Sequence, residues 1–236
     1  MMYTENQIEV WNKYTSFPLD DMSRNSWTEL SIIYNLSIEI IREFKDYLDW
    51  ICICTYQNLN EEELEEFINY IDFRTISIHQ TLSLPFIEKH SNQLYWEYIS
   101  SYQVLPEEFI RRNKDKVIWK IISSRQVLSE SFIEEFKDLL YWPSICGYQL
   151  LSEDFIRKHL NDMSWPHICF HQNLSDEFLE EFCDILDWYS LSMYQDMSYD
   201  FIKKMRTYID WYSITFNSNY SEEFINKLLV EIKPLK

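Results

Sequence analysis

Glycine and alanine are almost absent from this sequence of 236 residues: Gly147 is the single glycine, and alanine does not occur. Phosphate-cradling loops of nucleotide-binding folds need several residues without a Cβ, so one glycine excludes that class of fold. Tight two-residue hairpins also depend on glycine, which disfavours most all-β architectures. No signal-peptide pattern opens the sequence and no run approaches 18 apolar residues, so we expect a soluble, intracellular protein.

Basic residues are also few relative to acidic ones. The chain has 39 acidic residues against 21 basic ones, which gives a formal net charge of −18. A disordered acidic tail would be poor in apolar and aromatic residues, yet these make up 46% and 17% of the chain, enough for a real core. The five cysteines are odd in number and lack a CxxC pair, which indicates a reducing compartment.

A repeat of 23 residues organises the chain. A leucine or methionine opens each block without insertions, at Leu36, Leu59, Leu82, Leu105, Leu128, Leu151, Leu174 and Met197. Upstream residues are in register with a degenerate block, at Phe17, Trp27, Leu30 and Ser31. We therefore predict an N-terminal cap over 1–35, eight repeats over 36–219, and a partial repeat or cap over 220–236.

Each block contains the signals of two helices. A serine followed by carboxylates, as in Ser152-Glu153-Asp154, is typical of a helix N-terminus, and apolar residues at helical spacing then predict an amphipathic helix of about eleven residues. A tryptophan begins the second half, and Pro143 and Pro166 suit the first turn of a short second helix. Such a pair buries its apolar face only against neighbours. The sequence therefore predicts an all-α fold, an α-solenoid of eight helix pairs (a long helix plus a short helix) with terminal caps.

The unit resembles known repeat proteins most closely at 128–149 (LSESFIEEFKDLLYWPSICGYQ) and 174–195 (LSDEFLEEFCDILDWYSLSMYQ). These stretches are similar to the short helical-repeat proteins that giant DNA viruses, and some phages, encode in multiple copies. The resemblance covers residues 36 to about 225. It implies an accessory viral protein that acts on host components, and it carries over no functional residues.

Charged pairs change sign from one block to the next. They are Arg111-Arg112, Glu134-Glu135, Arg157-Lys158, Glu180-Glu181 and Lys203-Lys204. Opposed rows on neighbouring helices require this alternation, so we expect ion pairs between blocks that favour the correct register. Each exposed pair contributes under about 1 kcal/mol.

Glutamine forms the most regular polar column, at Gln57, Gln80, Gln103, Gln126, Gln149, Gln172 and Gln195. A row of amides could contact a repetitive ligand, as in helical-repeat RNA binders. The other interpretation is a structural ladder in which each amide bonds backbone groups of the turn between blocks. Identical glutamines carry no sequence code and no basic groove accompanies them, so we favour the ladder.

Two further sets of residues are candidate binding sites. Stacking would align the acidic helix starts into a negative rim, made of Glu61, Glu62, Glu107, Glu108, Glu153, Asp154, Asp176 and Glu177. This rim is either a solvated set of capping residues or an edge that attracts basic protein surfaces and imitates a phosphate backbone. The fourth block alone is basic and breaks two aromatic columns; its candidate contacts are Arg111, Arg112, Asn113 and Arg125. Drift within a tolerant repeat explains this block equally well.

No cofactor or catalytic group is predicted. His167 and His171 have a spacing that can hold a metal, but His171 takes a tyrosine column and no third ligand lies beside them in the sequence. The recurring serines are helix caps without a recurring histidine, and adjacent carboxylates are explained by capping. We therefore expect a protein that is not an enzyme.

These observations predict a non-enzymatic solenoid of viral type that binds a host protein, with basic or nucleic-acid-binding proteins among the candidates. The alternative is an acidic nucleic-acid mimic that inhibits a DNA- or RNA-acting host defence protein. A third hypothesis, single-stranded nucleic-acid binding, conflicts with the net charge, so we expect neither direct nucleic-acid binding nor membrane binding. The partial block at 220–236 keeps its apolar positions without a second helix, which leaves a homodimer through that end open.

Overall fold

The computed structural model describes residues 3–16, 18–33 and 35–232, and it divides into two compact units, Met1–Ile118 and Trp119–Lys236. Unit 1 contains α1 (Glu5–Tyr14), a 3₁₀ helix η1 (Leu19–Asp21), α2 (Arg24–Ile33), α3 (Ile38–Phe44), α4 (Trp50–Tyr56), α5 (Glu61–Glu66), α6 (Phe73–His79), α7 (Leu84–Lys89), α8 (Trp96–Tyr102) and α9 (Glu107–Arg112). Unit 2 contains α10 (Trp119–Arg125), α11 (Glu130–Glu135), α12 (Trp142–Tyr148), α13 (Glu153–Lys158), α14 (Trp165–His171), α15 (Asp176–Glu181), α16 (Trp188–Tyr194), α17 (Tyr199–Lys204), a 3₁₀ helix η2 (Ser213–Phe216) and α18 (Glu222–Glu231).

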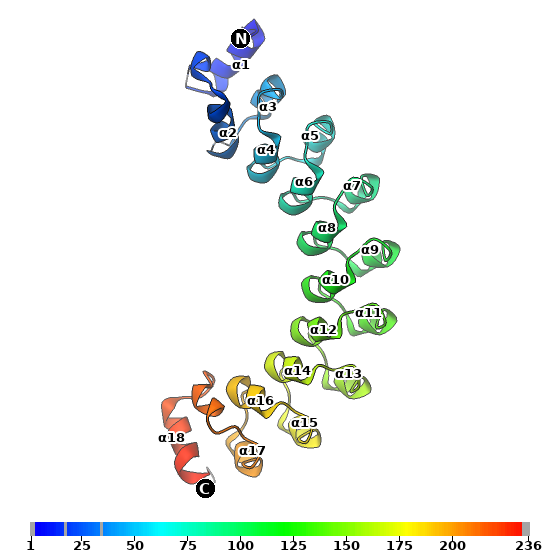
Figure 1. Cartoon of the computed structure of the whole chain (residues 1–236), viewed down its shortest axis with the longest axis vertical. Helices are drawn as coiled ribbons and strands as arrows, with labels where there is room; N and C mark the ends of the chain where they lie inside the picture. The colour runs from blue at the N-terminus through cyan, green and yellow to red at the C-terminus, as the bar shows by residue number, and fades with distance from the viewer. Residues whose placement is uncertain (1–2, 17, 34, 233–236) are drawn as a thin grey trace. The chain divides into compact units, whose positions relative to one another are not determined.

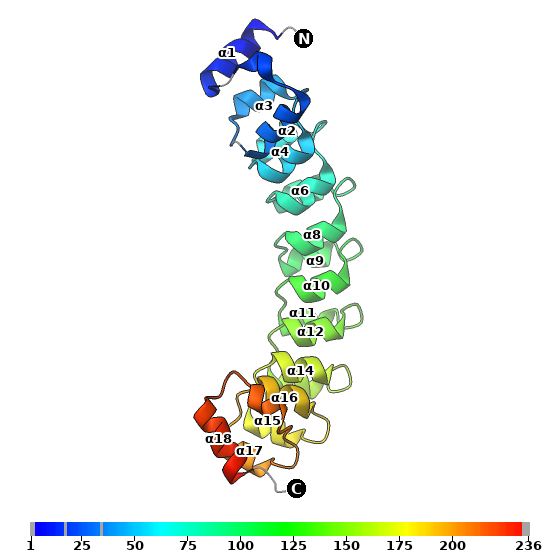
Figure 2. The same cartoon turned by 60° about the vertical axis from the view of Figure 1, so that its left-hand side comes forward.

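Two kinds of helix alternate along both units. The odd-numbered helices from α3 to α17 are the first helices of the repeats, and the even-numbered helices from α4 to α16 are the second helices. Within each unit, first helices lie on one side and second helices on the other (Figure 1). The second helices pack on one another in chain order, α4 to α8 in unit 1 and α10 to α16 in unit 2 (Figure 2). The described residues contain no strand, and the predicted all-α helical-repeat solenoid is confirmed.

Serine caps start the first helices as the sequence predicts. Ser152 Oγ, for example, accepts a hydrogen bond from the backbone N–H of Phe155 at 3.1 Å. Asn60 replaces serine before α5 and forms a capping box with Glu63. These bonds satisfy N–H groups that the first turn of a helix leaves without an intrahelical partner.

The first helices are shorter than predicted. From α5 to α17 each has six residues rather than about eleven, whereas the second helices have seven. After α11 the chain turns at Phe136, whose carbonyl accepts hydrogen bonds from the N–H groups of Leu139 (2.9 Å) and Leu140 (3.2 Å). This turn brings Leu140 back into the core. The expected pairing of a long with a short helix is therefore wrong, because apolar residues in such a turn keep the spacing of a helix.

Tryptophan closes the turn in several repeats. The indole N–H of Trp188 donates a hydrogen bond to the carbonyl of Cys183 at 2.7 Å, and Trp50 bonds Lys45 in the same way at 2.7 Å. Both tryptophans are partly buried rather than fully enclosed. The column thus lies at the edge of the core, where it packs on aromatic rings and satisfies a carbonyl that the short first helix leaves free.

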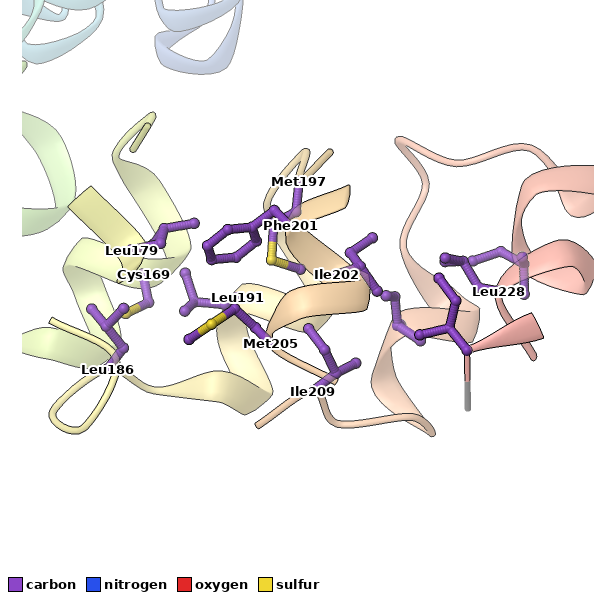
Figure 3. Packing of buried hydrophobic residues seen from close by; sticks show 13 residues of the cluster. Cys169, Leu179, Leu186, Leu191, Met197, Phe201, Ile202, Met205, Ile209 and Leu228 are labelled. Carbon is purple, nitrogen blue, oxygen red and sulfur yellow. The ribbon is translucent and has the colours of Figure 1, made fainter. Parts of the chain in front are cut away.

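The core of unit 2 lies between its first and second helices. Fully buried aliphatic residues include Ile156 of α13, Ile168 of α14 and Leu191 of α16. Figure 3 shows side chains from α14, α15, α16 and α17 meeting between these helices. Each repeat thus buries its apolar face against the next one, as the 23-residue pattern requires.

The ends of the described chain carry helices that depart from the repeat. In unit 1, α1 packs on α3 and α2 packs on α4, and buried Trp11 and Trp27 lie 5.5 Å apart and against Phe44. The predicted cap residue Phe17 lies outside the described residues. In unit 2, α18 buries Ile225 and Leu228.

Candidate binding surfaces

The glutamine column forms a buried hydrogen-bond ladder within each unit. Gln149 Nε2 donates to the carbonyls of Ser123 (3.0 Å) and Gln126 (2.8 Å), and its Oε1 accepts from the N–H of Leu128 (2.9 Å). Gln80, Gln172 and Gln195 also donate to two carbonyls of the preceding repeat. These side chains are buried and bond backbone groups. The glutamine column therefore forms the structural ladder between repeats that the sequence analysis favoured.

The ladder ends on different residues in unit 2. Asn217 Nδ2 donates to the carbonyls of Ser192 (3.0 Å) and Gln195 (2.8 Å), where a glutamine would otherwise do so. The asparagine side chain is shorter than glutamine, and the N–H of Met197 instead donates a hydrogen bond to the hydroxyl of Tyr220, at 2.6 Å. Burial raises the pKa of Tyr220 to about 12, so this hydroxyl stays protonated at neutral pH.

The small-residue column also has a polar role, which the sequence analysis missed. Ser123 Oγ accepts a hydrogen bond from the N–H of Tyr141 (2.9 Å), and Cys146 Sγ accepts one from the N–H of Ser164 (3.3 Å). These N–H groups stand just before the tryptophan of the following repeat. The restriction of the column to serine, cysteine and threonine, without alanine or glycine, was the available signal.

Burial makes these thiols poor nucleophiles. It raises the pKa of Cys54 to about 11 and that of Cys169 to about 12, so neither forms a thiolate at neutral pH. Both are buried and free of disulfides. The cysteine column is therefore part of the packing and not a reactive site.

Half of the predicted acidic rim ties repeats together. Glu61 accepts a hydrogen bond from the N–H of Ser83 (2.7 Å), and Glu153 accepts one from the N–H of Ser175 (2.6 Å). Asp176 accepts one from the hydroxyl of Ser198 (2.5 Å). Each carboxylate thus holds the capping residue of the next first helix. These residues, with Glu107, are partly buried.

The other half of the rim is exposed. It consists of Glu62 and Glu108 in unit 1, and of Asp154 and Glu177 in unit 2. Asp154 has a side chain 95% exposed and lies 3.3 Å from Arg157 of the same helix; Glu108 lies 3.3 Å from Arg111. The rim therefore separates into a structural row and an exposed row, which sequence spacing did not distinguish.

The alternating charges pair between repeats inside each unit. In unit 2, Lys158 lies 2.6 Å from Glu134, Arg157 lies 2.9 Å from Glu181, and Lys204 pairs with Glu180. In unit 1 the corresponding pairs are Arg42–Glu66, Lys89–Glu65 and Arg112–Glu88. The predicted ion pairs between blocks are confirmed for these helices.

The carboxylate of Glu134 contacts three basic side chains. Besides Lys158, its carboxylate contacts His159 Nε2 at 2.8 Å and Lys137 at 3.3 Å. His159 takes the place of a phenylalanine and is buried against Trp142. Hydrogen bonds from Lys158 and His159 hold the pKa of Glu134 at about 2, below its ordinary value of 4.5.

Acid should weaken unit 2 through this carboxylate. Because folding lowers the pKa of Glu134, its contribution to stability is complete above pH 4.5 and is lost as the pH falls toward 2. We expect the stability difference between the wild type and Glu134→Gln, measured by urea denaturation, to shrink across that window. Glu177→Gln removes an exposed carboxylate and is the control. A difference for Glu134→Gln that stays constant over the window would contradict this assignment.

The basic residues of the fourth block have structural partners in unit 1. Arg112 pairs with Glu88 at 2.9 Å, as its place in the charge alternation requires. Asn113 Nδ2 donates to the carbonyl of Phe109 in its own helix at 3.0 Å, and Arg111 contacts Glu108. In unit 2, Arg125 is exposed at the end of α10. The structure therefore explains Arg112 and Asn113 without a ligand.

The paired histidines of α14 lie on the surface of unit 2. His167 Nδ1 is 2.7 Å from Ser164 Oγ, and the ring of His171 lies 4.3 Å from that of Phe170. A Cβ on Gly147 would lie 3.4 Å from the His171 ring, an ordinary van der Waals contact, so this packing does not depend on glycine. Within the described residues, no group of three or more His, Cys, Asp or Glu side chains is placed to hold a metal ion.

Unit 2 carries an uncharged aromatic surface that the sequence analysis did not single out. The helices α12, α14, α16 and η2 contain no Asp, Glu, Lys or Arg. The exposed large apolar side chains of these helices, together with Tyr212 just before η2, form what we call the aromatic face: Tyr148, Phe170, Tyr189, Tyr194, Tyr212 and Phe216. A count of charged residues by position within each block would have shown that these second helices lack charge.

The rings of the aromatic face contact one another across helices. Tyr148 of α12 lies 6.0 Å from His171 of α14, and Phe170 lies 4.0 Å from Tyr194 of α16. A hollow of about 250 Å³ lies on this face, lined by Pro166, His167, Phe170, His171 and Ser190. Leu150, next to Gln149 of the buried ladder, is 93% exposed. The face thus includes ring contacts between neighbouring second helices, beside the hollow at α14.

A second cavity lies in unit 1. It has about 510 Å³ and is lined by Tyr14, Thr15, Ser16, Leu30, Asn35, Leu36, Ser37 and Ile40. Among the described residues, the lining combines apolar side chains with the hydroxyl groups of Tyr14, Thr15, Ser16 and Ser37 and the amide of Asn35.

Comparisons with known proteins identify no relative of this chain. No protein-family model matches the chain. No curated protein matches it, and no solved structure does. The resemblance to viral helical-repeat proteins therefore stays a prediction. Within the described residues, none of the helices is both long enough and apolar enough to cross a membrane.

Proposed function

We propose that the chain is a non-enzymatic solenoid that binds a protein partner through the aromatic face of unit 2. The observation that supports this function is the exposure of aromatic side chains on helices without charge, with Tyr148 67% and Phe216 57% exposed. Tyrosine provides a large apolar surface and a polar tip, and it is enriched at protein interfaces. A viral setting and a host partner are what the resemblance implies.

The other regular features of the repeat have structural partners. The glutamines bond the backbone between repeats, the serines and cysteines bond the N–H before the next tryptophan, and the charged pairs link neighbouring first helices. The rings of the aromatic face are exposed although the chain carries a net charge of −18. An apolar surface of this kind is typical of an interaction site.

A second candidate is the nucleic-acid mimic. The exposed acidic row (Asp154 and Glu177 in unit 2) supports it, because the structural row already has backbone partners. A mimic and an aromatic docking surface differ in salt dependence, since ionic contacts between exposed groups are screened and apolar ones are not.

Affinity capture from a cell lysate tests the proposal. We expect the wild type to retain a partner that the variant Tyr148→Ala/Tyr194→Ala/Tyr212→Ala loses. The control is Tyr102→Ala, which removes a tyrosine of the same column in unit 1 that is 58% exposed. Bound proteins are eluted in salt steps and identified by mass spectrometry.

The elution separates the candidate functions. A partner that depends on the aromatic face and resists high salt supports the proposal. A basic protein that elutes at moderate salt, and that the wild type and the triple variant capture equally, would favour the mimic. Equal capture of every protein by the wild type and the triple variant would overturn the assignment of the aromatic face, and recovery of nucleic acid alone would overturn both functions.

A further inference from the structure

We propose that the aromatic face binds an arginine-rich segment of the partner protein, an inference that rests on the proposed function and specifies the chemistry of the partner. Aromatic rings carry negative charge on their faces and attract cations, arginine most often. Two observations in unit 2 favour a cationic occupant over an uncharged one: among the described residues no lysine or arginine lies over the rings of the aromatic face, and exposed carboxylates follow Tyr194 closely in the chain.

Elsewhere in unit 2 the chain covers ring faces with its own cations. Lys120 lies over Tyr141 at 5.0 Å, Arg157 over Phe178 at 5.0 Å, and Lys227 over Tyr199 at 4.4 Å. Among the described residues, no lysine or arginine lies over a ring of the aromatic face. Since α12, α14, α16 and η2 contain neither residue type, no lysine or arginine of these helices competes for the exposed rings.

Exposed carboxylates follow α16 along the chain. Asp196 follows Tyr194 by two residues, and Asp200 lies in the first turn of α17. Both are exposed, as is Glu177, and none of the three has an ion-pair partner among the described residues. Two extended residues span about 7 Å, so one peptide can contact the ring of Tyr194 and the carboxylate of Asp196 together.

Arginine fits this combination better than lysine. Its guanidinium is planar and weakly hydrated, so it stacks on a ring and still donates paired hydrogen bonds to a carboxylate. The lysine ammonium is compact and strongly hydrated, and it responds mainly to net charge. A purely apolar segment would leave the exposed carboxylates without partners. The net charge of −18 also speeds the approach of any cationic segment.

Fluorescence anisotropy with two labelled peptides tests the inference. Nona-arginine and nona-lysine have equal charge, so their difference in affinity reports on the rings. At physiological ionic strength we expect nona-arginine to bind the full chain about fivefold more tightly than nona-lysine. The leucine variant, Tyr148→Leu/Phe170→Leu/Tyr189→Leu/Tyr194→Leu/Tyr212→Leu/Phe216→Leu, keeps apolar side chains at these positions and removes the rings of the aromatic face. It should bind nona-arginine only as tightly as nona-lysine.

Controls separate the rings from the charges. Tyr102→Leu in unit 1 should keep the full preference for arginine. The variant Glu177→Gln/Asp196→Asn/Asp200→Asn should bind both peptides more weakly than the wild type does. Far-UV circular dichroism of the leucine variant shows whether it is folded, and the exposed positions of its substitutions predict an unchanged melting curve.

Equal affinity of the wild type for both peptides would overturn the inference, as would an arginine preference that survives in the leucine variant. This failure is distinguishable from failure of the proposed function. If the peptides show no difference and the triple alanine variant still loses its captured partner, the aromatic face is a docking surface for another chemistry. If the alanine variant also captures every partner, the proposed function is wrong.

Discussion

Replacing Gln149 by leucine should lower the free energy of unfolding by about 3–5 kcal/mol, because a buried group left without its hydrogen bond costs about 1–3 kcal/mol. The substitution removes the acceptor for the N–H of Leu128 and the donors for the carbonyls of Ser123 and Gln126. Ser123 lies in the last turn of α10, and Gln126 and Leu128 lie in the loop between α10 and α11. Urea denaturation followed by far-UV circular dichroism measures the loss.

Tyr148→Leu is the matched control for this prediction. Tyr148 is adjacent in sequence and lies at the exposed end of the same helix, where it is 67% exposed. We expect this variant to change the free energy of unfolding by less than about 0.5 kcal/mol. Similar stabilities for Gln149→Leu and the wild type would show that the ladder contributes little to stability and would reopen the interpretation of the glutamines as ligand-binding groups.

Replacing Trp188 by alanine should lower the free energy of unfolding by about 3–5 kcal/mol, because it is a large-to-small change against a packed core. The indole stacks on Phe201 at 6.3 Å and lies 5.2 Å from the ring of Tyr208. It also donates a hydrogen bond to the carbonyl of Cys183 at 2.7 Å. The loss therefore combines packing with an unsatisfied carbonyl in the turn after α15, and it is measured by the same denaturation.

Trp188→Phe separates the two contributions. It keeps a ring against Phe201 and removes only the indole N–H, so we expect a loss of about 1 kcal/mol. The chain itself has this substitution at Phe73, where an aromatic ring suffices without the hydrogen bond. Equal losses for the alanine and phenylalanine variants would mean that the hydrogen bond, and not packing, holds the turn.

Local patterns in the sequence predicted the repeat and its polar framework well. The 23-residue period, the serine caps and the alternating charges reappear as helix pairs, capping hydrogen bonds and ion pairs between neighbouring helices. These features depend on the identity of residues a fixed distance apart along the chain. A strict repeat converts sequence distance into spatial distance, because the same contact recurs 23 to 26 residues away.

The lengths of the first helices were not predictable in the same way. Phe136 and Leu140 have helical spacing, but the chain turns between them and Leu140 reaches the core from that turn. The periodicity of apolar residues reports which side chains are buried. It does not report whether the backbone between them is a helix or a helix followed by a turn.

The candidate surfaces depended still more on the tertiary structure. The adjacent carboxylates Glu153 and Asp154 look alike in the sequence, yet Glu153 bonds the next repeat at Ser175 and Asp154 is exposed. The aromatic face required knowing which ring of each second helix points outward and that Phe170 and Tyr194 touch across helices.

The sequence by itself thus determined the all-α repeat, its period and the buried glutamine column, since these follow from residue types at fixed spacing. Only the tertiary structure decided where the first helices end, which carboxylates are structural, and that the exposed rings of unit 2 form one surface. Each of these depends on contacts between a repeat and its neighbour, and the direction of a side chain toward a neighbour or toward solvent is a property of the packed helices.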